Sequence, residues 1–203
     1  MRSLSVLIIC SIFFSSSLGE SKCQSHADRH KATQHLLKLV ESETEEVSTV
    51  RRLLKAGANL EAHSLVGGVS YYTPLQWSAY RHHWETVMLL VKRGANVNLK
   101  VPFGDEHYYS PLALCARFGP SEVLKLLIAH GAKVNDQNNH HAHTPLMCAA
   151  SEGKIENVKV LLKQGAKVNS VSWLGKATAL SMAEERGHTA IARLLRCWKS
   201  RKS

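Results

Sequence analysis

The sequence predicts an all-α solenoid of helix–turn–helix repeats with hairpin-like fingers projecting between them. Gly-Ala pairs begin at residues 57, 94, 131 and 165, with spacings of 37, 37 and 34. Hydroxyl residues at positions 73, 110, 144 and 178 recur with spacings of 37, 34 and 34. Two independent markers with nearly the same period indicate a repeat architecture, in which each unit buries its apolar face against its neighbours.

Residues 1–19 are predicted to be a secretory signal peptide. Arg2 is followed by the apolar run "LSVLIICSIFF" and the small residues "SSSLG", an order typical of a cleavable signal. The run is shorter than the about 20 residues that span a bilayer. We expect cleavage near Gly19 or Glu20 and a secreted or periplasmic protein. A retained anchor and an atypical first helix are the alternatives, and residues 20–32 form a segment ahead of the repeats.

About four to five repeat units follow over residues 33–198. Their predicted boundaries are 33–64, 73–100, 110–138, 144–172 and 178–198, and residues 199–203 form a basic tail. The first unit is degenerate because only its second half is intact. The last unit lacks the proline and the closing Gly-Ala pair and is expected to be a C-terminal cap. Terminal repeats are expected to be atypical because their outer faces meet water.

The unit "TPLMCAASEGKIENVKVLLKQGA" shows why each repeat should fold as two helices. The Thr144 hydroxyl can cap a helix, and Pro145 suits the first helical position because its missing N–H would be unpaired there anyway. A second apolar stripe at helical spacing follows Gly153, and Gly165 should end that helix in a left-handed conformation. The residues expected to be buried between repeats are Leu126, Leu127, Leu161 and Leu162.

These units resemble the ankyrin repeat, whose pattern is "TPLxxAAxxG…VxxLLxxGAxVN". "TPLMCAASEG…NVKVLLKQGAKVN" matches closely, "SPLALCARFG…EVLKLLIAHGAKVN" and "TPLQWSAYRH…TVMLLVKRGANVN" match well, and "TALSMAEERG…AIARLLRCW" is recognisably similar. The resemblance covers roughly residues 33–198. It implies a protein-binding module that uses the finger row and the first-helix surface as one concave face.

The resemblance also implies which side chains face a partner. In such a repeat, the residue before the hydroxyl cap and residues one turn after the "TPL" segment face the groove. The predicted partner-binding residues are Tyr72, Tyr80, Arg81, Tyr109, Arg117, Phe118 and His143. Tyrosine and arginine are enriched at interface hot spots. Tyr71 and Tyr108 should point the other way, because side chains alternate along an extended chain. The alternative is that all four tyrosines only pack the fingers, of which the first two are longer than the later ones.

Four residues of the repeats are assigned to the interior. Cys115 and Cys148 fall in the first helices of neighbouring units, where helix axes are about 8–10 Å apart. A disulfide needs Cα atoms within about 7 Å, so both are expected to be buried free thiols. Trp77 and Trp84 fall at apolar positions of the first full repeat and are expected to be core residues.

Histidine and cysteine clusters raise the possibility of a metal site. Cys23, His26 and His30 have helix-like ligand spacing, and "HHAH" at 140–143 should lie on a fingertip. Either could bind Zn or Cu, but neither forms a set of four ligands with matched spacing. No metal and no cofactor is therefore expected, although a metal-dependent sensor stays an alternative.

The function favoured is a non-enzymatic, monomeric scaffold that binds a protein partner. Motifs typical of nucleophile elbows, phosphate-binding loops and zinc proteases are absent from the sequence. The formal net charge is +10, which favours acidic partners. The alternative function is a polyanion-binding module for nucleic acid, acidic glycan or anionic lipid, although nucleic acid is disfavoured because charge is the only feature that points to it.

Overall fold

The structure is a computed structural model that describes residues 25–66, 70–99, 109–137, 142–173, 175 and 177–200. The side chains of residues 64–66, 70–71 and 199–200 are also left out of the description. The predicted signal peptide, Cys23, Tyr108 and two residues of the "HHAH" segment lie outside the described residues, as does the side chain of Tyr71. Expectations about them stay predictions.

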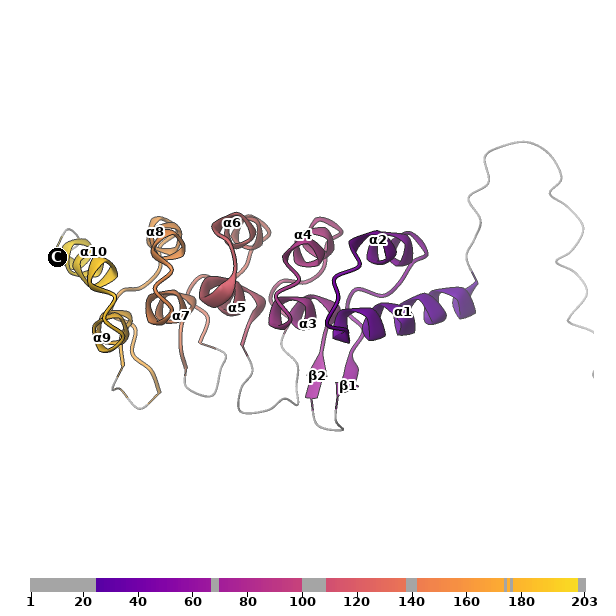
Figure 1. Cartoon of the computed structure of the whole chain (residues 1–203), viewed down its shortest axis with the longest axis horizontal. Helices are drawn as coiled ribbons and strands as arrows, with labels where there is room; N and C mark the ends of the chain where they lie inside the picture. The colour runs from indigo at the N-terminus through magenta and orange to yellow at the C-terminus, as the bar shows by residue number, and fades with distance from the viewer. Residues whose placement is uncertain are drawn as a thin grey trace, which may run out of the picture.

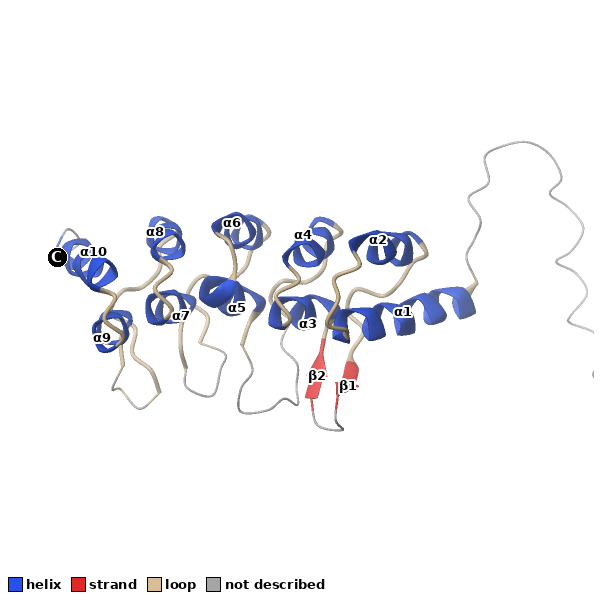
Figure 2. Cartoon of the chain, viewed as in Figure 1, coloured by secondary structure: helices blue, strands red, loops and turns tan. Residues whose placement is uncertain are grey.

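Helices dominate the described part of the chain, with one two-stranded antiparallel hairpin (Figure 2). The elements are α1 (His26–Glu41), α2 (Val47–Lys55), β1 (Ser64–Val66), β2 (Ser70–Tyr72), α3 (Pro74–Tyr80), α4 (Trp84–Lys92), α5 (Pro111–Phe118), α6 (Ser121–Ala129), α7 (Pro145–Ser151), α8 (Ile155–Lys163), α9 (Ala179–Glu185) and α10 (Thr189–Ser200).

The helices pair and stack into a solenoid (Figure 1). The first helices of the pairs, α3, α5, α7 and α9, continue the line of α1, while α2, α4, α6, α8 and α10 form a second row above them. In the connection between α2 and α3, the hairpin of β1 and β2 projects on the side of the first helices. The predicted all-α solenoid with projecting fingers is confirmed.

Hydroxyl caps and prolines start the first helices as the sequence predicts. The Thr73 hydroxyl accepts a hydrogen bond from the Gln76 backbone N–H, and the Gln76 side chain accepts one from the Thr73 N–H. The Thr144 and Thr178 caps of α7 and α9 make the same reciprocal pair of bonds, whereas the Ser110 hydroxyl at α5 only accepts, from the Ala113 N–H. The leucine after each proline is almost fully buried, and these leucines are Leu75, Leu112 and Leu146. Each cap gives a hydrogen-bond acceptor to a backbone N–H that would otherwise be unpaired at the buried start of the helix.

Glycine ends the second helices with a left-handed turn. The φ angles of Gly57, Gly94, Gly131 and Gly165 are 74°, 89°, 86° and 83°. A Cβ atom disfavours this conformation in other residues. The turn sends the chain away from the helix row and into the finger.

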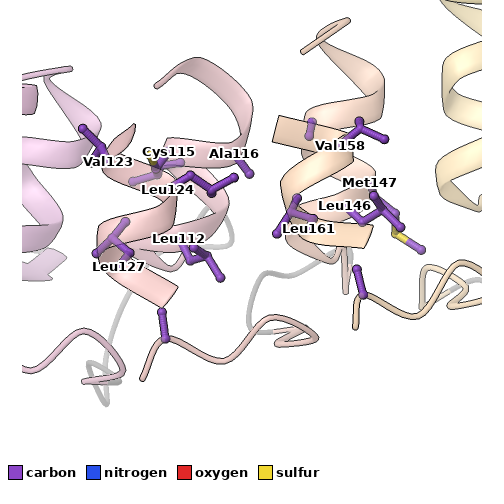
Figure 3. Close-up of a cluster of buried hydrophobic side chains, with 14 of the residues drawn as sticks. Leu112, Cys115, Ala116, Val123, Leu124, Leu127, Leu146, Met147, Val158 and Leu161 are labelled. Atoms are coloured by element: carbon purple, nitrogen blue, oxygen red, sulfur yellow. The ribbon is translucent and has the colours of Figure 1, made fainter. Parts of the chain in front are cut away.

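The core runs along the stack between the two helix rows (Figure 3). Leu127, Leu161 and Leu162 are buried as expected, at 0%, 0% and 2% exposure. The expectation for Leu126 was wrong in degree because this side chain is only half-buried. Residues 123, 124 and 127 form the buried stripe of α6, and residue 126 lies on its flank.

Asparagine side chains connect neighbouring repeats. The Asn98 amide donates to the Gly131 carbonyl at 2.7 Å and accepts from the Lys133 N–H at 3.0 Å. Asn135 makes the same pair of bonds with Gly165 and Lys167 one repeat later. Because both ends of the amide are used, the spacing between successive Gly-Ala loops is fixed.

The interior residues mostly lie where the sequence placed them. Cys115 and Cys148 are buried and free, as expected. Trp77 is buried at 8% exposure, whereas Trp84 is half-buried against the main core. None of the described helices is both long enough and apolar enough to cross a membrane.

Candidate functional site

The last turn of α3 carries a stack of aromatic rings. Trp77 lies at its centre, with ring centroids 5.2 Å from Tyr72 and 5.3 Å from Tyr80. The Trp77 and Tyr80 rings are nearly parallel, with an interplanar angle of 5°, and the Arg81 guanidinium lies 5.3 Å from the Trp77 ring centroid. These separations suit offset stacking and a cation–π contact.

The stack joins a buried anchor to an exposed surface. Trp77 and Tyr72 contact the core cluster that α1 and α2 form with this end of the solenoid. Tyr80 is 54% exposed, which is a large value for an aromatic side chain, and Arg81 is also exposed. The neighbouring rings therefore fix the orientation of the Tyr80 ring, while much of this ring stays open to solvent.

A second group forms one repeat further along, at α5. Tyr109 precedes the Ser110 cap, and the guanidinium carbon of Arg117 lies 6.0 Å from the centroid of its ring. The same guanidinium lies 4.7 Å from the Phe118 centroid. The ring of His82, in the turn between α3 and α4, lies 4.7 Å from Phe118 and so connects the two groups.

Two ion pairs that share the Glu152 carboxylate extend this surface to α7 and α9. Two guanidinium nitrogens of Arg117 lie 2.8 and 2.9 Å from one Glu152 carboxylate oxygen. Arg186, after α9, approaches the same oxygen at 3.7 Å. We call the whole set the aromatic–arginine track; its members are Tyr72, Trp77, Tyr80, Arg81, His82, Tyr109, Arg117, Phe118, Glu152 and Arg186.

The electrostatics of the track favour a neutral ring surface with a positive rim. Burial raises the pKa of Tyr109, Cys148 adds to this effect and Arg117 opposes it, so the phenol stays protonated at neutral pH. Burial, followed by the nearby His83 and Lys154, lowers the pKa of His82. The track contains three arginines against the single carboxylate of Glu152, which contacts two of them.

Six of the seven predicted site residues fall into these two groups. Tyr72, Tyr80 and Arg81 belong to the first group, and Tyr109, Arg117 and Phe118 to the second. His143 is half-buried and occupies the equivalent place before the Thr144 cap of α7. The structure thus assembles residues that are up to 46 positions apart in the sequence, from Tyr72 to Phe118.

Sequence reasoning missed four members of the track. Trp77 was assigned to the core alone, although its buried ring also supports Tyr80. Glu152 and Arg186 stand eight residues after their hydroxyl caps, as the predicted Arg81 does, so the same counting could have found both. His82 stands where later repeats have Gly153 and Gly187, and its φ of 62° shows that it keeps the glycine-like turn.

A separate cleft of about 460 Å³ lies at the N-terminal end of the solenoid. It lies between the first half of α1 and the loop before β1, and its lining includes Arg29, His30, Asn59 and His63. Within the described residues no group of three or more His, Cys, Asp or Glu side chains is arranged to hold a metal ion. None of the predicted site residues lines the cleft.

The residues of the track have properties that suit contact with another molecule. Its rings are fixed by stacking, and its charges are arginines and one paired carboxylate. The burial of Cys148 and Cys115 raises the pKa of each thiol to about 12, so neither is a thiolate at neutral pH. Flat rings and guanidinium groups at one row of helix ends suit recognition of another molecule.

Stacked helix pairs with projecting fingers define the chain as a solenoid repeat protein. The family model for ankyrin repeats (3 copies) matches at residues 36–138, 106–172 and 135–202. The chain therefore belongs to the ankyrin repeat family, whose members generally mediate protein–protein interaction and are typically non-enzymatic scaffolds. Comparison with curated proteins gives no significant match.

Proposed function

We propose that the protein is a non-enzymatic scaffold that is exported from the cytoplasm and binds a protein partner through the aromatic–arginine track. The observation that carries the proposal is the stack of Tyr72, Trp77 and Tyr80, which leaves Tyr80 54% exposed. A ring already fixed by stacking loses little conformational entropy when a partner covers it. When a partner covers Tyr80, little of the binding free energy is therefore lost to ordering its side chain.

The position of the track also supports the proposal. Its members lie at the ends of α3, α5, α7 and α9 and at the finger residues just before the caps. The resemblance to ankyrin repeats implies that these elements face the groove that the family uses for partners, so one partner could contact several repeats at once. The three arginines favour a partner segment that combines apolar with acidic side chains.

The test begins with a photoreactive phenylalanine analogue in place of Tyr80, used to identify the partner in the native compartment. Binding of the identified partner is then measured for Tyr80→Ala with Arg81→Ala. We expect a loss of at least about 2 kcal/mol, or a roughly 30-fold rise in Kd, as for hot-spot residues. Both side chains are exposed, so the melting temperature should change little.

A matched control is Arg51→Ala with His130→Ala. This pair also removes one guanidinium and one ring, but Arg51 is exposed on α2 and His130 is exposed at the end of α6. The control should bind as the unaltered protein does. Equal binding by the Tyr80 and Arg81 variant, or equal loss by the control, would refute the assignment of the track.

Export is the part of the proposal that rests on the sequence alone. A basic residue, a short apolar run and small residues open the chain, and this pattern is typical of a cleaved signal. N-terminal sequencing of the protein from the medium or periplasm should give a start near Glu20. A protein that begins at Met1, or that stays in the cytoplasm, would contradict export without affecting the binding surface.

A further inference from the structure

Four equivalent segments of the repeats carry basic residues and no acidic ones. Residues 52–59, 89–96, 126–133 and 160–167 each hold the end of a second helix and the Gly-Ala loop. Together they contain seven Lys and Arg residues and no Asp or Glu. They therefore contribute seven positive charges to a chain whose formal net charge is +10. We call the seven the basic row: Arg52, Lys55, Lys92, Arg93, Lys133, Lys163 and Lys167.

Every member of the basic row is exposed, and none forms an ion pair with another residue that the structure describes. All seven side chains are exposed. The ion pairs found in the described part of the chain involve Arg117, Lys159, Arg186 and Arg196, and none involves the row. Lys159 shows the contrast, because it lies one turn before Lys163 and pairs with Glu156 at 2.7 Å.

The spacing of the row is fixed by the scaffold. Asn98 holds the backbone of Lys133, and Asn135 holds that of Lys167, each from the preceding repeat. The second helices α2, α4, α6 and α8 lie side by side (Figure 1), and packed helices are about 8–10 Å apart. The row thus presents one or two cations about every 10 Å along one edge of the solenoid.

Helix dipoles explain only part of the row. Cations at the carbonyl end of a helix interact favourably with its dipole. Such positions are occupied by Arg52, Lys55, Lys92 and Lys163 in last turns and by Arg93 at the C-cap of α4. Lys133 and Lys167 follow the Gly-Ala pairs and lie beyond the helices. The helix dipoles do not account for cations at Lys133 and Lys167, yet both residues extend the same line of charge.

We propose that the basic row binds a linear acidic polysaccharide. A chain with regularly spaced sulfate or carboxylate groups matches a row of lysine and arginine side chains through charge alone. The four segments contain no Phe, Tyr or Trp on which nucleic acid bases could stack. The exposed large apolar side chains of the described residues are Tyr80, Val171 and Trp173, so the row itself has none to insert into a bilayer.

This surface is separate from the aromatic–arginine track. The row lies at the carboxyl ends of the second helices, whereas the track lies along the first helices and fingers. The proposal therefore does not rest on the proposed protein-binding function. A partner protein and an acidic glycan could occupy the two surfaces independently.

The experiment measures binding of the purified protein to heparin, a sulfated polysaccharide, over a series of salt concentrations. The row variant carries Lys92→Gln, Lys163→Gln and Lys167→Gln. It should bind at least tenfold more weakly at 0.15 M salt, and the slope of log affinity against log salt should fall by about 2–3, or roughly 0.7–0.9 for each lost contact.

The matched control carries Lys31→Gln, Lys38→Gln and Lys154→Gln. These lysines are exposed and lie off the row, so the control loses the same charge and should bind within threefold of the unaltered protein. Equal loss in both variants would overturn the proposal, because binding would then follow net charge alone. Circular dichroism and melting temperature should show that both variants stay folded.

Two further probes separate the glycan from other polyanions. The protein is titrated with single-stranded oligo-dT at the same total charge as the heparin, and with vesicles that contain anionic lipid. The assignment is supported if the oligonucleotide and the vesicles both bind more weakly than heparin and bind the row variant as well as the unaltered protein. Row-dependent binding to oligo-dT or to vesicles that equals binding to heparin would overturn it in favour of nucleic acid or membrane.

Discussion

Replacement of Asn157 by alanine is expected to uncouple two neighbouring repeats. Asn157 belongs to α8 and is 3% exposed. Its side-chain amide donates to carbonyls at the end of α5 in the preceding repeat, at 3.0 Å to Gly119 and 3.1 Å to Ala116. Residue 120 is proline and has no N–H, so Ala116 cannot make its usual helical bond four residues on. Asn157 supplies the missing donor from another repeat.

The size of the effect follows from the number of carbonyls left unpaired. Loss of the amide leaves two buried carbonyls without this donor, at about 1–3 kcal/mol each. The third carbonyl near the amide, that of Cys115, still accepts from the Gly119 N–H at 2.8 Å. Asn157→Ala should therefore lower the free energy of unfolding by about 2–6 kcal/mol, measured by urea denaturation with circular dichroism.

Two further variants make this prediction specific. Asn157→Asp keeps the side-chain size but removes both donors and should destabilise the protein at least as much. Asn169→Ala makes the same chemical change at an exposed finger position and should alter stability by less than about 0.5 kcal/mol, as is usual for surface sites. A loss below about 0.5 kcal/mol for Asn157→Ala would show that the amide does not stabilise the junction.

Further predictions concern the core, a histidine and the thiols. Leu161→Ala should lower the free energy of unfolding by about 2–5 kcal/mol in urea, because Leu161 is fully buried (Figure 3); a change below about 0.5 kcal/mol would refute the repeat register. The pKa of His82 is lower in the folded protein than the ordinary value of 6.5, so this imidazole binds a proton more readily in the unfolded chain. Stability should therefore fall as pH falls through 6.5 and below. His82→Asn, which tolerates the left-handed turn, should show a smaller drop in melting temperature between pH 7.5 and pH 5.5, and an unchanged drop would exclude His82 as the cause. Cys115 and Cys148 should react with a thiol reagent only after denaturation, because burial raises each pKa to about 12; two thiols that stay blocked in denaturant would indicate a disulfide.

The fold was predictable because its signals are local. A hydroxyl cap, a proline at the first helical position and a glycine after the second helix act within a few residues of one another. Repetition of these signals in successive units made their positions unambiguous. Leu126 was the exception, since the sequence marked it as apolar but only the stacking of α6 decided how much of it water reaches.

The candidate site was predictable only in outline. Counting from the caps placed Tyr80 and Arg81 on one surface, and the structure shows them stacked around Trp77. The support of Tyr80 by a buried ring depends on how α1, α3 and the first finger meet. The assignment of these residues to partner binding stays a proposal.

The sequence by itself determined the helices, their order and the direction in which each chain segment leaves its helix. Only the tertiary structure decided which side chains meet across repeats. The Arg117–Glu152 pair joins residues 35 positions apart, and the Asn157–Cys115 bond joins residues 42 apart. The physical reason is that caps and turns depend on nearest neighbours along the chain, whereas these contacts depend on how far each repeat rotates and shifts against the last, which the packing of the whole stack sets.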